Sequence, residues 1–97
     1  MTSIYWTERA QNDLAAIHAF VLEDSFYYAD VVVRKILATV DRLRDFPESG
    51  RLVPEFDDAT LREVIVAPYR IAYRIIKKGE IHVLAVHHSA RGAHRRL

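Results

Sequence analysis

A chain of 97 residues, 51% hydrophobic and 28% charged, has the size and composition of one soluble globular domain with a modest core. It contains no cysteine, which excludes disulfides and thiolate metal sites, and no apolar run approaches the roughly 20 residues that span a bilayer. The N-terminus lacks the basic and then apolar pattern of a signal peptide, so we expect a single domain over residues 1–97 and a cytoplasmic protein.

The net charge of +1 conceals an uneven distribution along the chain. Residues 61–97 carry eight Lys or Arg and two acids, a net charge of +6, whereas residues 1–60 carry six Lys or Arg and eleven acids, a net charge of −5. A basic segment of this kind attracts either phosphate or an acidic protein segment. Charge alone does not choose between these two partners.

The N-terminal half is predicted to form a short strand over Ser3–Trp6 and then two helices. Thr7 is placed to cap the first helix, and apolar residues at helical spacing extend it over residues 8–23. A second cap at Ser25 begins another apolar helical repeat, which Pro47 ends. Two amphipathic helices with so short a connection form an antiparallel hairpin, whose acidic face we expect to be solvated.

The C-terminal half is predicted to form most of a sheet. Residues 51–60 resemble an irregular, acidic connector, and three strands follow, over Leu61–Val66, Tyr69–Ile76 and Ile81–His87. The turns between these strands are short enough for hairpins, and the basic tail, residues 89–97, is either a short helix or disordered. This order predicts an α+β domain, with an N-terminal strand and an α-helical hairpin packed on a small antiparallel β-sheet.

The side chains of the last two strands indicate that both faces of the sheet are in contact with other segments or partners. In the middle strand, apolar side chains alternate with a second set that includes Arg70 and Arg74, so one face needs a core and the other is cationic. Strict alternation in the last strand puts Val83 on one face and Val86 on the other. We therefore expect the helices to cover one face of this strand, and the tail or a partner chain to cover the other.

Short segments spread over almost the whole chain point to a family. In chain order they are Trp6, Ala10, Asp13-Leu14, Ile17, Leu43, Phe46-Pro47, Gly50-Arg51, Leu61-Arg62-Glu63, Tyr69-Arg70-Ile71, Tyr73, Val83-Leu84-Ala85-Val86-His87 and Arg91. In this order and spacing the chain resembles the RelE/ParE superfamily of bacterial toxins, specifically its ParE-like branch, also described as plasmid stabilisation proteins. The resemblance implies a type II toxin that a cognate antitoxin neutralises by direct binding, with an antitoxin segment that folds as it wraps the toxin.

The resemblance leaves the target to be decided, because ParE relatives poison DNA gyrase whereas RelE relatives cut mRNA on the ribosome. The ribonucleases carry cations on the strand before the Tyr-Arg hairpin, where this chain has Glu63 and Ile65. Neither side chain can clamp a scissile phosphate, so we predict gyrase inhibition with no catalytic residue. One alternative is a ribosome-dependent mRNA endoribonuclease that uses His87 or His88 as acid or base. Another is a member that only binds its antitoxin and regulates the operon.

The candidate contact residues for the gyrase target or the antitoxin are cations of the sheet and the tail. They are Arg62, Arg70, Arg74, His87, Arg91, Arg95 and Arg96. Any single arginine among them could instead belong to an ordinary surface ion pair. We expect no cofactor, no membrane partner and no sequence-specific contact with nucleic acid. We also expect no metal, because consecutive strand residues such as His87 and His88 point to opposite faces and cannot easily share an ion.

Overall fold

Two antiparallel helices follow a short first strand, as the sequence predicted. The computed structural model describes residues 1–97 and begins with β1 (Ser3–Trp6), α1 (Glu8–Leu22) and α2 (Phe26–Asp41), followed by the 3-10 turn η1 (Arg42–Arg44). The side chains of Thr7 and Ser25 cap the two helices by accepting hydrogen bonds from backbone N–H groups of the first turn. The second helix ends at Asp41, earlier than Pro47 alone predicts, because the chain tightens into η1.

The remaining chain completes a five-stranded sheet. It consists of β2 (Arg51–Leu52), β3 (Leu61–Val66), β4 (Tyr69–Lys77), β5 (Glu80–His88) and a final 3-10 turn, η2 (Ser89–Arg91). The strand order is β1-β5-β4-β3-β2, with β1 parallel to β5 and all other neighbours antiparallel. The sheet is therefore mixed rather than antiparallel throughout, and the expected irregular connector begins with a strand, because the backbone of residues 51–52 pairs with β3.

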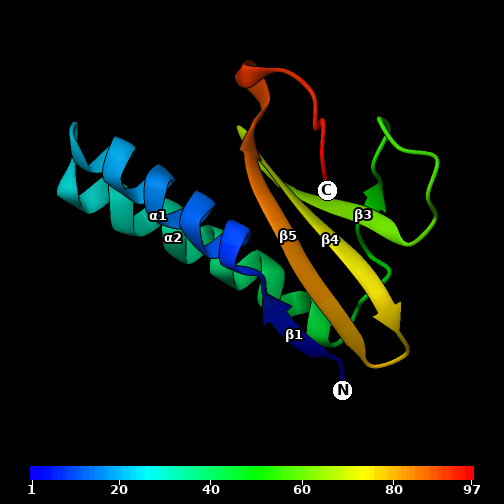
Figure 1. The fold of residues 1–97 in the computed structure, drawn as a ribbon. Helices are drawn as coiled ribbons and strands as arrows, with labels where there is room; N and C mark the ends of the chain where they lie inside the picture. Colours follow the sequence, from blue (N-terminus) through cyan, green and yellow to red (C-terminus); the bar gives the residue numbers. More distant parts are fainter.

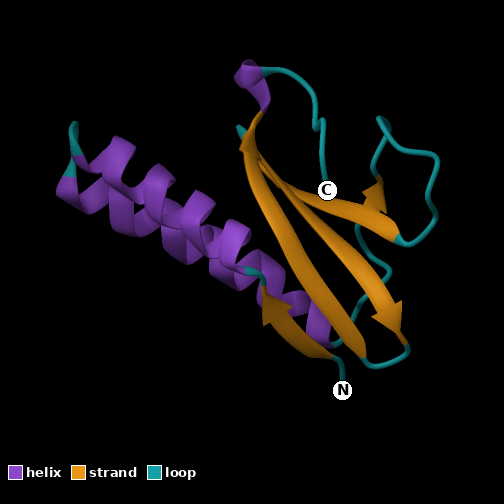
Figure 2. Cartoon of the chain, viewed as in Figure 1, coloured by secondary structure: helices purple, strands orange, loops and turns teal.

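The core lies between the helical hairpin and one face of the sheet (Figures 1 and 2). Its buried side chains come from both helices, η1 and the two longest strands: Ala10, Val32, Ile36, Val40, Leu43, Tyr69, Ile71, Tyr73, Ile81, Val83 and Val86. Tyr73 is fully buried, and its hydroxyl donates to the Pro47 carbonyl at 2.7 Å and accepts the Gly50 N–H at 3.0 Å. These two bonds attach the loop that follows η1 to the centre of the sheet.

A β-bulge in β5 decides which residues reach the outer face of the sheet, the face away from the helices. Ala72 lies opposite Ala85 while the next residue, Tyr73, lies opposite Val83, so Leu84 is the extra residue. Beyond the bulge the alternation is reversed, and Val86 belongs to the core with Val83. The prediction that these two valines lie on opposite faces was wrong, because strict alternation assumes an uninterrupted ladder.

The C-terminal tail covers part of the outer face. After η2 the chain turns back from the end of β5 toward β3 (Figure 1). His94, in the middle of this tail, is only 4% exposed. The sequence predicted that either the tail or a partner chain covers the outer face of the last strand. The tail covers part of it. Neither α1 nor α2 combines the length and the hydropathy that crossing a bilayer requires.

Candidate functional site

The seven predicted contact residues fall into two groups. Arg70 and Arg74 on the outer face of β4 form ion pairs with the chain's own carboxylates, and Arg62 on β3 donates to backbone carbonyls. The second group lies at the end of β5 and in the tail, and none of its members forms an ion pair. We call this second group the open cations: His87, Arg91, Arg95 and Arg96.

Arg70 is the centre of a buried network on the outer face. Its two terminal nitrogens each lie 2.6 Å from an oxygen of Glu55, and its Nε lies 2.9 Å from Glu63. Glu63 also accepts from Arg51, with an Nη2 to Oε2 distance of 2.6 Å. The Glu63 side chain is completely buried and that of Arg70 is 12% exposed. The chain itself therefore supplies the anions that the cationic face was expected to bind.

The protonation of this network follows from its hydrogen bonds. The bonds from Arg70 lower the pKa of Glu55 to about 2, although burial acts in the opposite direction. The same bonds raise the pKa of Arg70 above its ordinary value. Both groups are therefore ionised at neutral pH.

Arg74 on the outer face and Arg62, opposite Tyr73 on the helix side, also hold the chain together. The Nη1 of Arg74 lies 2.9 Å from an oxygen of Asp58. Hydrogen bonds from the Thr60 hydroxyl and backbone, followed by those from Arg74, lower the pKa of Asp58 to about 2. Arg62 donates to the Gly50 carbonyl at 2.9 Å. The acidic connector thus folds over Arg70 and Arg74, a pairing between segments too distant in sequence to be read from local patterns.

His94 was not among the contact residues predicted from sequence, although it lies against the two carboxylates of the Arg70 network, Glu55 and Glu63. Its backbone N–H donates to Glu55 at 2.8 Å, and its ring lies 5.0 Å from that of His87. Its Nε2 is 3.2 Å from a Glu63 oxygen, but the two groups are not aligned for a hydrogen bond. Burial, and then the charge of Arg70, lower the pKa of His94, which favours the neutral imidazole. A single histidine in a basic tail gives no sequence signal of this role.

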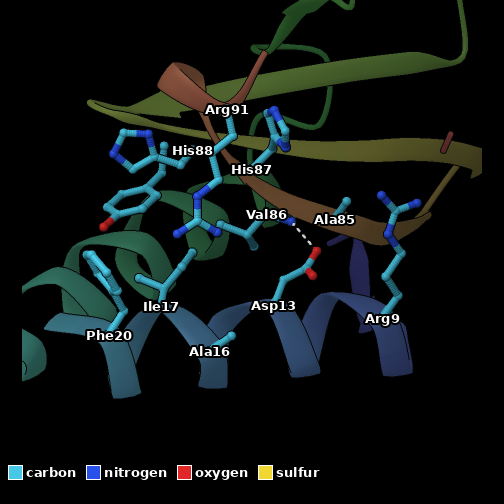
Figure 3. A pocket seen from close by; sticks show the side chains of 11 residues that line it. Arg9, Asp13, Ala16, Ile17, Phe20, Ala85, Val86, His87, His88 and Arg91 are labelled. Atoms are coloured by element: carbon cyan, nitrogen blue, oxygen red, sulfur yellow. Dashed lines mark hydrogen bonds between the residues drawn. The ribbon is translucent and has the colours of Figure 1, made fainter. Parts of the chain in front are cut away.

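A groove runs between α1 and the end of β5 (Figure 3). This α1–β5 groove has a volume of about 170 Å³ and is lined by Arg9, Asp13, Ala16, Ile17, Phe20, Tyr69, Ala85, Val86, His87, His88 and Arg91. Asp13 points from the helix to the strand and accepts the Val86 N–H at 3.0 Å. The expectation that the acids of the hairpin are solvated was wrong for Asp13, because this strand end offers an N–H to the facing helix.

The guanidinium of Arg91 closes one end of the α1–β5 groove. It lies 5.8 Å from the centre of the Phe20 ring, a cation–π distance, and reaches from η2 toward α1 (Figure 3). An arginine held over an aromatic ring keeps its outward N–H groups available to a ligand. Arg91 is therefore positioned by the protein without being neutralised by it.

The adjacent histidines diverge, as the strand period predicted. His88 packs edge-on against Tyr69 on the helix side, with ring centres 5.3 Å apart, and its Nδ1 accepts the Ala90 N–H. His87 lies opposite Arg70 in the ladder, on the outer face, and its Nε2 is 2.8 Å from the Gly92 carbonyl. That contact orients His87 against the tail.

A helical hairpin on one face of a small mixed sheet, with cations grouped at one end, is the architecture expected of a small toxin of the RelE/ParE superfamily. Residues 4–92 match the family model described as the ParE toxin of the type II toxin–antitoxin system parDE, and the chain belongs to this family. As a type II toxin, it has an antitoxin as its partner.

Individual proteins support this membership. Toxin RelE2 of Caulobacter vibrioides is 33% identical, over 94% of this chain and 99% of that one. The putative toxin Y4kP of Sinorhizobium fredii is 39% identical over 88 residues, which cover 89% of this chain and 86% of that one. A chain from the chromosomal ParDE toxin–antitoxin system of P. aeruginosa superposes with a TM-score of 0.73 at 26% identity, covering 91% of this chain and 96% of that one.

Proposed function

We propose that this toxin acts in the cytoplasm by binding and poisoning DNA gyrase, without a catalytic residue of its own, until a cognate antitoxin covers the same surface. The observation that supports the proposal is the position of Glu63 and its burial in ion pairs. It stands where the resemblance places phosphate-binding cations in the ribonuclease branch, and it is buried in ion pairs with two arginines. A carboxylate so placed supports a role in structure rather than in cleaving RNA.

The contact surface in this proposal is the set of open cations. His87, Arg91, Arg95 and Arg96 have no carboxylate partner, so an incoming partner need not displace one. Arg70 and Arg74 contribute indirectly, since they hold the connector, whose Glu55 binds the backbone of the tail. Arg62 contributes by holding the loop that follows η1. An uncompensated charged surface favours fast association with an oppositely charged partner.

The antitoxin in this proposal presents acidic and apolar side chains. The acidic groups match the open cations, and the apolar groups match a second groove, on the helical hairpin, of about 550 Å³. This second groove is lined by Trp6, Gln11, Leu14, Ala15, His18, Val33 and Leu37. A segment that folds on binding gains from both kinds of contact.

A second function, ribosome-dependent mRNA cleavage, has one observation in its favour. His87 lies in a hollow with Arg91 and Arg95, so an imidazole that can exchange protons is close to cations that can bind phosphate. A relative at 33% identity is also named Toxin RelE2. The two functions predict different products, which makes them separable.

The test is to incubate the purified chain with gyrase, ATP and supercoiled plasmid, stop the reaction with detergent and protease, and measure linear DNA. The proposal predicts linear plasmid only when gyrase is present, and none when antitoxin is added. A parallel reaction contains ribosomes translating an mRNA, whose cleavage is mapped by primer extension. Cut mRNA with undisturbed plasmid would replace gyrase poisoning with the ribonuclease function. Neither product would favour a chain that only binds its antitoxin.

A further inference from the structure

The tail forms a hollow whose walls are rich in arginine. It adjoins the α1–β5 groove, has a volume of about 290 Å³ and is lined by Arg9, His87, Arg91, Ala93, His94, Arg95 and Arg96. We call it the tail hollow. Four arginines and two histidines converge on it, and its lining includes no acidic residue and only one apolar one.

The chain leaves this charge uncompensated although it neutralises arginines elsewhere. On the outer face of the sheet, Arg51, Arg70 and Arg74 each have a carboxylate partner within 3 Å. None of the four arginines of the tail hollow has one. Convergent cations without counter-charges repel one another, so a site of this kind gains free energy when it binds an anion.

Arg9 shows that the convergence is built into the fold. It is the second residue of α1, where the helix dipole disfavours a positive charge. Its guanidinium donates to the carbonyl of Arg96, which draws the end of the tail over the start of the helix. Only one of its five N–H donors is used in this bond, and the rest are free for a ligand.

We propose that the tail hollow binds a backbone phosphate of duplex DNA, so that the toxin contacts the DNA as well as the enzyme in the gyrase complex. This inference rests on the proposed function. The planar guanidinium fork matches phosphate oxygens in two-bond contacts, and several such groups around one hollow suit an anion with charge on more than one oxygen.

The walls of the tail hollow favour DNA over a free nucleotide. A free nucleotide gains affinity by stacking its base, but within the hollow it would meet only one apolar residue, Ala93. The α1–β5 groove shares Arg9, His87 and Arg91 with the hollow, so these three residues border both spaces.

The experiment measures binding of the full-length chain to a short fluorescent DNA duplex by anisotropy, over a series of salt concentrations and without gyrase. The test variant is Arg91→Gln with Arg95→Gln. The matched control, Arg34→Gln with Lys35→Gln, removes the same charge from exposed positions of α2 outside the hollow. We expect the test variant to lose about tenfold or more in affinity and the slope of log K against log salt to become shallower by about one, because the hollow holds one phosphate and each phosphate contact contributes about 0.9. The control should lose less than about twofold.

Several results would overturn the inference. The first is absence of DNA binding by the unaltered chain, and the second is an equal loss in both variants, which would mean attraction by net charge alone. A third is displacement of the duplex by ATP at an equal concentration of negative charge, which would assign the hollow to a nucleotide. Because gyrase is absent, this result is independent of the plasmid assay. A chain that binds DNA through the hollow but yields no linear plasmid would contradict only the proposed function.

Discussion

Replacing Glu63 by glutamine removes one charge from the buried network while keeping the shape of the side chain. Breaking a buried ion pair from one side costs about 3–5 kcal/mol when the partner charge is left uncompensated. Here Arg70 keeps its two bonds to Glu55, and the Arg51 side chain is 58% exposed and can be hydrated. We therefore expect Glu63→Gln to lower the free energy of unfolding by about 2–3 kcal/mol, a large fraction of the stability of a small domain.

The assay is urea unfolding of the purified toxin, followed through the fluorescence of Trp6, which is the only tryptophan and packs against the core. The matched control is Asp41→Asn, which breaks the exposed pair between Asp41 and Arg44 and should cost under about 1 kcal/mol. A Glu63→Gln protein within about 0.5 kcal/mol of the unaltered chain would refute the reasoning, since a loss this small is typical of surface pairs.

Three further predictions concern the tail, the loop after η1 and the α1–β5 groove. The pKa of His94 is below 6.5 in the folded state, so as the pH falls the unfolded chain binds a proton that the folded chain does not. The free energy of unfolding therefore falls as the pH drops below about 6.5. His94→Gln should flatten this dependence in urea melts at a series of pH values. Gly50→Ala should lower the melting temperature, because a Cβ there would lie 2.5 Å from the Tyr73 hydroxyl oxygen, and an unchanged melting temperature would show that the loop can move aside. Asp13→Ala should cost about 1–2 kcal/mol in chemical denaturation, because it leaves the Val86 N–H without its acceptor, whereas Asp13→Asn keeps an oxygen there and should cost less; equal losses would contradict this explanation.

The main elements of the fold could be predicted because their patterns are local. The caps at Thr7 and Ser25 and the apolar helical repeats give both helices, and the period of two gives the three long strands. The position of β1 could not be predicted in the same way. A strand of four residues carries no information about which edge it joins or in which direction, so its parallel pairing with β5 depends on how the hairpin packs.

The candidate site was only partly predictable, for two physical reasons. The bulge at Leu84 changes which face His87 occupies, and a one-residue slip of this kind leaves no mark in an uninterrupted apolar run such as residues 83–86. The arginines of the sheet and of the tail look alike in sequence, yet Arg70 is neutralised and Arg91 is not. That difference depends on where Glu55 lies in the folded chain, which is a long-range contact.

The central claim, that the toxic lesion is in DNA, is tested most directly in living cells. Cells are induced to make the toxin without its antitoxin, and their chromosomes are analysed by pulsed-field electrophoresis while one abundant mRNA is probed for cleavage. We expect fragmented chromosomes and intact mRNA at the time growth stops, with fragmentation abolished when the target gyrase is replaced by a toxin-resistant form. Growth arrest with an intact chromosome and cleaved mRNA would contradict the account and place the target at the ribosome.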